Sequence, residues 1–247
     1  MELQVTSEVE STGRTFAEMN VARSHFQHVF AARLLAEPGL KGRVLDIGCG
    51  GGLPVALRGQ DRLFPNLDGV DVSETVAGHP LLRNRWRGCF EDSPVPAASY
   101  DLSFAYNVVE HIPDARRFFE KVSAVLKPGG VFWALTPNGS HPFCLLSRSI
   151  ELIGMKPLLA RAIRSKTKQN IINDIPSYYR LNRAGQVLRA IRALPFVKAH
   201  FVYVACVQWD TLFPVPLRWL PHGFDRVLGN RLGRCMLVLA YRLERGG

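Results

Sequence analysis

Residues 43–59 read RVLDIGCGGGLPVALRG, and this stretch decides the fold. The apolar residues around Asp46 predict a short buried strand, and five glycines follow between positions 48 and 59. A glycine-rich turn after a strand lets the main chain approach a ligand closely. The stretch therefore predicts a strand, a ligand-binding turn and a helix that opens over residues 53–58.

The spacing of these glycines excludes the two common phosphate-binding loops. A dinucleotide loop of the form G-x-G-x-x-G needs a third glycine, but the two available registers put Leu53 or Val55 there. A P-loop needs Lys and then Ser or Thr after its last glycine, and neither residue follows here. The pattern that remains is D-x-G-x-G-x-G, formed by Asp46, Gly48, Gly50 and Gly52.

Helices and strands alternate along the rest of the chain. Helices are predicted over 15–36, 74–84, 114–126 and 182–193, with Asp114 as the cap of the third. Strands are predicted over 43–47, 66–72, 85–90, 100–109, 131–136, 196–206 and 235–243. This alternation predicts an α/β fold with a doubly wound, mostly parallel sheet of seven strands.

Several ordered motifs resemble those of one family. The D-x-G-x-G-x-G loop resembles the cofactor loop of class I S-adenosylmethionine-dependent methyltransferases, and Asp71 ends the second strand of the core 19 residues past Gly52. Residues 88–101, 107–114 (NVVEHIPD) and 126–138 (LKPGGVFWALTPN) are similar to later motifs, the second of them to the type 11 methyltransferase group. The resemblance implies a Rossmann-like methyltransferase fold with a helical insert after the fifth strand. It also implies a methyl donor, S-adenosyl-L-methionine, that leaves as S-adenosyl-L-homocysteine.

The resemblance also implies which residues bind this cofactor. Asp46 would face its cationic groups, the glycines would pass beneath its ribose and methionine portions, and Asp71 would accept the ribose hydroxyls. Cys89 stands where many relatives carry an Asp for the adenine amino group, so that role would pass to the Phe90 backbone or to Glu91. The full predicted set is Asp46, Gly48, Cys49, Gly50, Gly52, Asp71, Val72, Cys89, Phe90, Glu91 and Asn107.

Catalysis would need a base if the methyl acceptor is a hydroxyl. Ligands bind at the carboxyl ends of the strands in such sheets, where His111 follows the fourth strand and His141 the fifth. Either histidine is a candidate base, and Glu110 is a candidate to orient one of them. The sequence shows no cluster of metal ligands, so no metal is expected.

The acceptor pocket is expected to come from the N-terminal helix and from the insert after Asn138. Residues 174–182 read DIPSYYRLN, and similar Tyr-Tyr-Arg segments occur in type 11 relatives of cell-envelope saccharide or lipid pathways. Tyr178, Tyr179 and Arg180 could supply stacking faces and a fork for an anionic group. The alternative is that the tyrosines pack this segment onto the sheet.

The chain is expected to form one methyltransferase domain over 1–247. Its parts would be an N-terminal helical lid (1–40), a cofactor-binding core (41–140) and two basic amphipathic inserts (141–181 and 207–232). Residues 1–140 carry 14 Lys and Arg against 16 Asp and Glu, whereas residues 141–247 carry 17 against 5. The inserts would therefore contact an anionic membrane surface, or form the acceptor pocket, or do both.

The five scattered cysteines form no C-x-x-C pair, and no apolar run reaches the length of a membrane span. A cytoplasmic protein is expected, with peripheral contact to the inner membrane face as an alternative. The leading functional prediction is O-methylation of a small-molecule, saccharide or lipid-linked acceptor. The alternatives are a tRNA or rRNA methyltransferase that uses the basic half, and a non-catalytic cofactor-binding module. The sequence indicates no oligomeric state.

Overall fold

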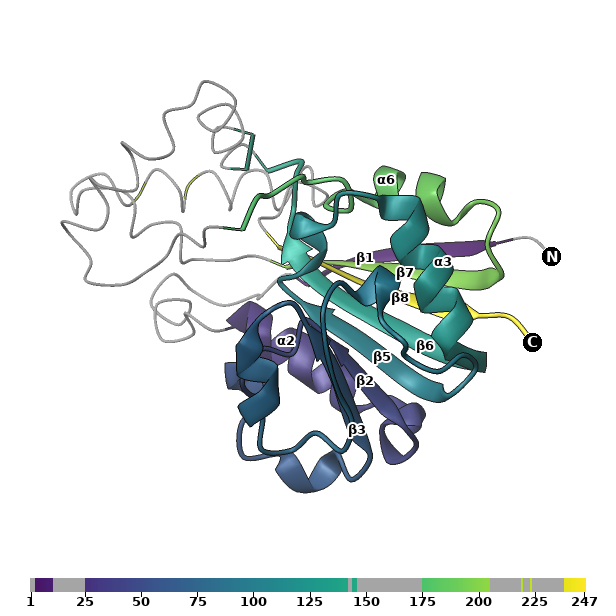
Figure 1. The fold of residues 1–247 in the computed structure, drawn as a ribbon. Coiled ribbons are helices and arrows are strands. Elements are labelled where there is room, and N and C mark those ends of the chain that lie inside the picture. The colour runs from purple at the N-terminus through teal and green to yellow at the C-terminus, as the bar shows by residue number, and fades with distance from the viewer. Residues whose placement is uncertain are drawn as a thin grey trace.

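A computed structural model of the chain describes residues 3–10, 25–141, 144–145, 175–204, 219, 223 and 238–247. These residues form one sheet of eight strands with helices on both faces (Figure 1). The strands are β1 (Gln4–Glu10), β2 (Val44–Ile47), β3 (Leu67–Asp71), β4 (Arg85–Arg87), β5 (Tyr100–Tyr106), β6 (Leu126–Pro137), β7 (Phe196–Val204) and β8 (Val238–Arg245).

The strand order is β1-β7-β8-β6-β5-β2-β3-β4. Only β8 runs antiparallel to its neighbours, and the other described pairs are parallel. From β2 the chain winds outward through β3 and β4, and it then returns to place β5 and β6 on the other side of β2. The order therefore reverses between β2 and β5, which is where open α/β sheets bind their ligands.

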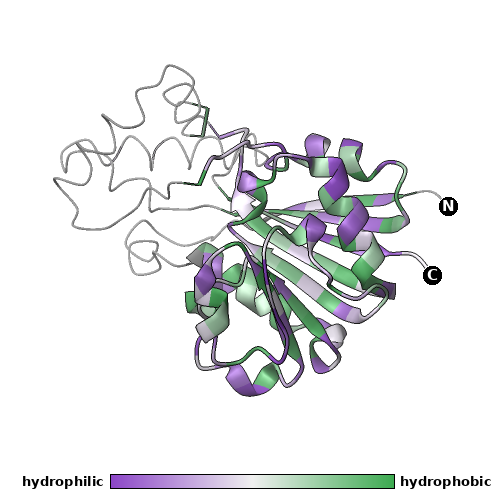
Figure 2. Ribbon diagram, viewed as in Figure 1, coloured by the Kyte–Doolittle hydropathy of each residue, from purple (hydrophilic) through white to green (hydrophobic). Residues whose placement is uncertain are grey.

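The helices divide the core into two layers. On one face α3 (Ala115–Val125) and α6 (Ala184–Ile191) pack on the sheet, and on the other α2 (His25–Leu35) does so. The strands of parallel sheets are buried on both faces, so they carry continuous apolar runs. Figure 2 shows these runs as green along the central strands, with purple on the outer parts of the helices.

Helix α3 begins and ends where the sequence predicts. The Asp114 carboxylate accepts hydrogen bonds from the backbone N–H groups of Arg116 (3.0 Å) and Arg117 (3.1 Å), which have no partner inside the helix. The apolar side chains of α3 are buried against the sheet, with Phe118 and Phe119 fully enclosed. Pro113 and this cap together fix the start of the helix.

Strand β1 is the eighth strand, and the sequence did not predict it. Residues 1–40 were expected to be a helical lid, but Gln4–Glu10 pairs in parallel with β7 at the edge of the sheet. Its first residues are exposed, and Val5 has 47% of its surface open. An edge strand of this kind is held by backbone hydrogen bonds, so it lacks an apolar pattern.

The helix predicted to open over 53–58 is absent. A single turn of 3₁₀ helix, η2 (Val55–Leu57), follows the glycine loop, and a second, η3 (Asp61–Leu63), follows that. Pro54 lies just before η2, and Gly59 (φ +81°) turns the chain away soon after it. The predicted helix over 74–84 is likewise a short 3₁₀ segment, η4 (Glu74–Gly78), which ends before Pro80.

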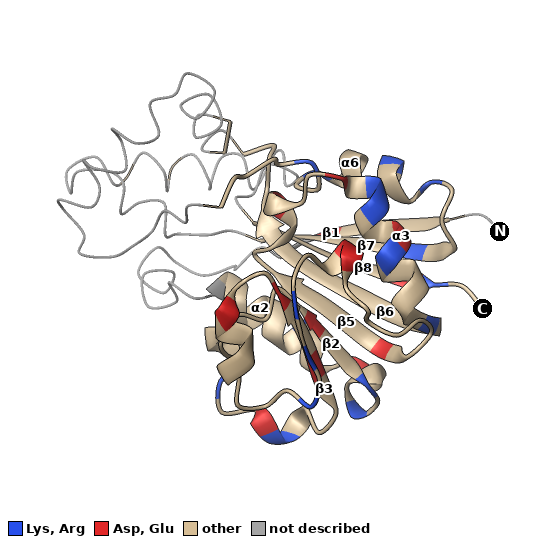
Figure 3. Ribbon diagram, in the orientation of Figure 1, with Lys and Arg blue, Asp and Glu red and all other residues tan. Residues whose placement is uncertain are grey.

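Most of the two basic inserts, and residues 15–24 of the helix predicted over 15–36, lie outside the described residues. Figure 3 shows Lys and Arg along α3 and α6, but the α3 arginines are paired: Arg116 with Glu120 and Arg117 with Asp92. Within the described ranges every helix is too short or too polar to cross a membrane.

Candidate cofactor site

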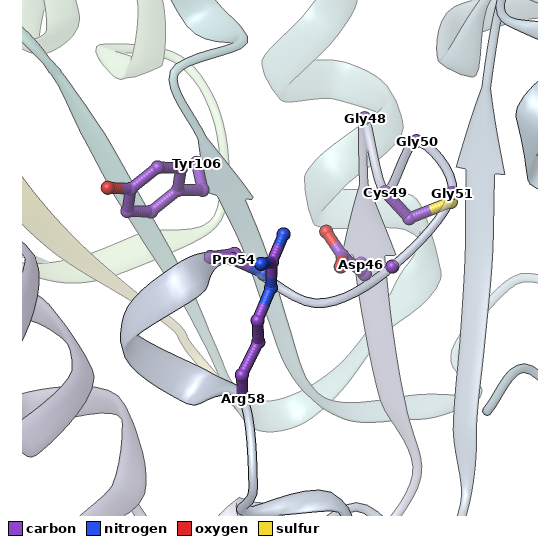
Figure 4. A pocket seen from close by; sticks show the side chains of 9 residues that line it. Asp46, Gly48, Cys49, Gly50, Gly51, Pro54, Arg58 and Tyr106 are labelled. Atoms are coloured by element: carbon purple, nitrogen blue, oxygen red, sulfur yellow. The ribbon is translucent and has the colours of Figure 1, made fainter. Parts of the chain in front are cut away.

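A pocket of about 340 Å³ opens at the carboxyl end of β2, beside the end of β5. Ligand pockets in proteins span about 300–1,000 Å³, so this one suits a small molecule. The pocket is lined by Asp46, Gly48, Cys49, Gly50, Gly51, Gly52, Pro54, Arg58 and Tyr106 (Figure 4). Of the residues that the sequence predicts to bind the cofactor, the five between Asp46 and Gly52 meet here.

Asp46 is the most unusual residue of the pocket. Its surface is 1% exposed, and its Oδ2 atom has no hydrogen-bond partner among the described residues. Burial raises the pKa of this carboxyl well above its ordinary value, and the nearby Asp71 raises it further. A buried carboxylate without a partner is costly, and a cation bound in the pocket would relieve that cost.

The glycines of the loop serve two purposes: one is required by the fold, and two leave room for a ligand. Gly48 has φ +77°, and a Cβ atom there would overlap the Val108 side chain, so only glycine fits. At Gly50 and Gly52, by contrast, a Cβ atom would meet no atom of the described residues within 4 Å. These two glycines leave open space on the pocket side of the loop, where a ligand can approach the main chain.

Asp71 holds the loop in this shape. One carboxylate oxygen accepts a hydrogen bond from the Gly50 N–H at 2.7 Å, and the other accepts one from the Ser73 N–H at 2.7 Å. Each oxygen keeps a further lone pair, so the predicted contact with ribose hydroxyls stays compatible with this geometry. Asp71 does not line the pocket at the β2 end, and neither does Val72, whose side chain is exposed.

The residues predicted near adenine lie on a short 3₁₀ turn, η5 (Phe90–Asp92), after β4. Cys89 is exposed at the start of this turn, whereas the Phe90 ring is buried 5.6 Å from the ring of Phe118. Phe90 can therefore offer a ligand only its backbone. Glu91 is partly buried, and this burial raises the pKa of its carboxyl.

Tyr106, the last residue of β5, lines the pocket, and Val108 follows two residues later beside Gly48 of the glycine loop. Asn107 lies between them with φ +54°, and its N–H already donates to the Leu135 carbonyl at 2.9 Å. Any contact that this backbone makes with a ligand must therefore use its carbonyl. Tyr106, Pro54, Gly51 and Arg58 line the pocket but were not predicted to do so.

A second cluster gathers the predicted catalytic and acceptor residues. The Glu110 carbonyl accepts hydrogen bonds from the N–H groups of Tyr178 (2.7 Å) and Tyr179 (3.1 Å). The His111 Nδ1 atom lies 2.9 Å from the Pro176 carbonyl, and Arg180 donates to the Pro113 carbonyl at 2.5 Å. The Ser177 hydroxyl also lies 3.4 Å from His111 Nδ1, so five contacts join segments 109–113 and 176–180, which are far apart in sequence.

Buried polar bonds support this cluster from below. The Glu110 carboxylate accepts a hydrogen bond from the Thr136 hydroxyl at 3.1 Å, and that hydroxyl accepts one from the Asn182 amide at 2.7 Å. Burial raises the pKa of Glu110. Its carboxyl therefore points into the protein, toward the end of β6.

His141 is the second candidate base that the sequence singles out. It follows β6, its side chain is buried, and its N–H donates to the Asn138 carbonyl at 2.9 Å. Neither His111 nor His141 lines the pocket. Within the described part of the chain, no three His, Cys, Asp or Glu side chains gather as metal ligands would.

Comparison with known proteins identifies the family. A family model described as a methyltransferase domain matches residues 22–189, which is more than half of the chain. This chain belongs to that family. The predicted class I S-adenosylmethionine-dependent methyltransferase, with its Rossmann-like fold, is confirmed.

Curated relatives of this methyltransferase match part of the chain. A ubiquinone biosynthesis O-methyltransferase of Chelativorans sp. is 36% identical over 128 residues, which cover 47% of each chain. A probable S-adenosylmethionine-dependent methyltransferase of Mycolicibacterium smegmatis is 34% identical over 101 residues, which cover 38% of each chain. The chain thus spans less than half the length of these two relatives.

Solved structures share the fold. A geranyl diphosphate C-methyltransferase of Streptomyces coelicolor, solved with Mg²⁺, geranyl diphosphate and S-adenosyl-L-homocysteine, superposes with a TM-score of 0.57 at 16% identity. The match covers 96% of this chain and 86% of that one. At this identity the likeness supports the architecture and nothing finer.

The pocket of this methyltransferase fits S-adenosylmethionine. The cofactor carries a sulfonium and an ammonium, and the Asp46 carboxylate, whose Oδ2 has no partner among the described residues, would face such cations. Gly50 and Gly52 would lie against the cofactor, because no atom in the described part of the chain fills the space beside them. Cys49 would act only as packing, because burial raises the pKa of its thiol far above the ordinary value.

Proposed function

We propose that this methyltransferase transfers the methyl group of S-adenosylmethionine to a hydroxyl oxygen of a small-molecule, saccharide or lipid-linked acceptor. The observation that carries the proposal is the buried Asp46 carboxylate in a glycine-walled pocket at the reversal of strand order. The names of curated relatives, among them ubiquinone biosynthesis O-methyltransferases, support oxygen as the acceptor atom.

S-Adenosylmethionine supplies a methyl carbon that its sulfonium already activates. The protein must hold the acceptor oxygen in line with that carbon and exclude water. As the oxygen–carbon bond forms and the carbon–sulfur bond breaks, the hydroxyl proton must pass to a base, and S-adenosylhomocysteine is left. Asp46 and the glycine loop would bind the methyl donor.

His111 is the base that the geometry favours. A backbone carbonyl can only accept, so the 2.9 Å contact with Pro176 requires the proton of the neutral imidazole to be on Nδ1. The Nε2 lone pair is then available to take a proton. This arrangement is the one that a general base needs, and segment 176–180 sets it.

Tyr178 would supply an acceptor-binding face. Its side chain is 41% exposed, and the Arg180 guanidinium lies 6.0 Å from the centre of its ring. Arg180 is also held by the Pro113 carbonyl. We therefore assign Arg180 to fixing the orientation of Tyr178, with the outer face of the ring left for the acceptor.

Two measurements test the proposal in sequence. Calorimetry should show binding of S-adenosylhomocysteine to the purified protein, and no binding at millimolar ligand would overturn the cofactor assignment. The protein is then incubated with methyl-labelled S-adenosylmethionine and separate phenolic, saccharide, polyprenyl-lipid and RNA pools. Mass spectrometry should find the label as a methoxy group in one of the first three pools.

The same experiment separates the alternatives. Label in RNA, together with RNA affinity that falls steeply with salt, would replace the proposal with an RNA methyltransferase. Cofactor binding without label in any pool would indicate a non-catalytic binding module. Flotation with anionic vesicles tests the membrane contact predicted for the basic inserts, which stays a prediction.

A further inference from the structure

The pocket contains a second charge that the proposed mechanism does not use. Of the described residues that line it, only Asp46 and Arg58 are charged. Arg58 is exposed and has no ion pair or hydrogen-bonded partner for its guanidinium among the described residues. Figure 4 shows its side chain extending from the end of its turn toward the space between Tyr106 and Asp46.

The local fold fixes this placement. Leu57 is fully buried and anchors the η2 turn to the core. The Arg58 N–H closes the turn by donating to the Val55 carbonyl at 3.3 Å, and the backbone then extends into Gly59. The turn thus places a cation at the pocket rim, only six residues after the last glycine of the loop.

We propose that Arg58 binds the carboxylate of the methionine portion of the cofactor. This inference rests on the proposed function and adds a binding residue to the same site. The amino-acid end of the cofactor is a zwitterion, with an ammonium and a carboxylate on one carbon. The pocket has one buried anion and one cation without a partner among the described residues, which matches that pair of charges. A guanidinium can hold a carboxylate through two parallel hydrogen bonds.

The two pocket charges also discriminate between ligands. A phosphate group drawn to Arg58 would meet the Asp46 carboxylate in the same pocket, which disfavours nucleotides. Adenosine or 5′-methylthioadenosine would leave both charges without partners. Arg58 is therefore expected to select ligands that keep the complete amino-acid end.

Calorimetry with two matched ligands tests this inference. The first is S-adenosylhomocysteine, and the second is its decarboxylated analogue, which keeps the ammonium but has no carboxylate. Arg58→Ala should lower the affinity for the first ligand about tenfold or more and leave the affinity for the second unchanged. Arg58→Lys should retain part of the preference, because an ammonium keeps the charge but not the fork.

Arg62→Ala is the matched control, because Arg62 is an exposed arginine on η3 that does not line the pocket. It should leave both affinities unchanged, and thermal melts should show that all variants stay folded. Equal effects of Arg58→Ala on the two ligands, or none on either, would overturn the inference while the cofactor assignment stands. If the unaltered protein binds neither ligand, the proposed function itself fails.

Discussion

The Val108 side chain fills the space that a Cβ atom at Gly48 would occupy. This contact joins the glycine loop after β2 to the segment that follows β5, and these two segments form opposite sides of the switch point. The position of the loop is therefore coupled to the position of the segment that carries the candidate base.

Alanine substitutions in the loop should separate stability from binding. Gly48→Ala combines a strained positive φ with overlap against Val108, so it should cost about 2–4 kcal/mol of unfolding free energy. A Cβ atom at Gly52 would meet no atom of the described residues within 4 Å, so Gly52→Ala should leave thermal stability unchanged. Its methyl group would intrude on the cofactor and weaken the binding of S-adenosylhomocysteine. Thermal melts and calorimetry measure the two effects. Full affinity in Gly52→Ala would show that the cofactor lies elsewhere.

Asp46→Asn should abolish tight cofactor binding and stabilise the free protein. Burial disfavours the charged carboxylate, so the neutral amide should raise the unfolding free energy at pH 7 by about 1 kcal/mol or more. For a domain of this size each kcal/mol raises the melting temperature by about 2–4 °C. Loss of both stability and binding would instead indicate that Asp46 has a structural partner.

The affinity for S-adenosylhomocysteine should fall as the pH is lowered toward the raised pKa of Asp46, because only the carboxylate attracts a cation. The fall should begin at a higher pH than an ordinary aspartate would give. The residual affinity of Asp46→Asn should lack this component. Calorimetry across a pH series provides the comparison, and parallel pH profiles for the two proteins would contradict the assignment.

His111→Ala should lower the methyl-transfer rate by about 10²–10⁴-fold while the affinity for S-adenosylhomocysteine stays unchanged. The physical reason is the loss of the Nε2 atom, which can accept a proton when Nδ1 donates to the Pro176 carbonyl. His200→Gln is the control, because His200 lies on β7 and bonds to Thr6 at the far edge of the sheet. If His111→Ala keeps the original methyl-transfer rate, His111 is not the general base.

His79 should make the fold less stable in mild acid. The imidazole is fully buried, its Nδ1 accepts the Leu81 N–H at 3.2 Å, and burial together with Arg85 lowers its pKa below 6.5. As the pH falls below about 6.5, the unfolded chain binds a proton that the folded protein does not. The contribution of His79 to the free energy of unfolding is therefore complete above that pH and is lost as the pH falls below it. The loss is about 1.4 kcal/mol for each pH unit by which the pKa in the folded protein lies below that in the unfolded chain.

His79→Asn keeps an acceptor for the Leu81 N–H but removes the titration, so its stability should change less between pH 7 and pH 5. Urea unfolding at each pH measures the difference between the two proteins. Identical pH dependence would show that His79 is not responsible.

The positions of the core strands along the chain, the glycine loop and helix α3 could be predicted from the sequence, because buried parallel strands and a capped amphipathic helix have distinct patterns. Strand β1 could not, since its polar residues are held at the edge by backbone pairing with β7. Arg58 was missed for a related reason: its place at the pocket depends on a 3₁₀ turn where the spacing favoured a helix.

The contacts between segments 109–113 and 176–180 could not be predicted from the sequence either. Glu110 and His111 were singled out by a motif, and Tyr178 by its aromatic neighbour, but the 60 or so residues between them carry no signal that the two segments meet. Only the folded chain brings the Pro176 carbonyl within 2.9 Å of the His111 Nδ1 atom. Long-range backbone contacts of this kind have no local signature.

The short turn after the glycine loop has one more consequence. A long helix at this position would direct the partial positive charge of its N-terminus at the cofactor, and η2, with three residues, provides almost none. Recognition of the amino-acid end would then depend on two full charges, of which Asp46 is buried and Arg58 is exposed. Added salt screens exposed charges far more than buried ones. Ionic strength should therefore erode the carboxylate preference first and leave the attraction for the cationic groups largely intact.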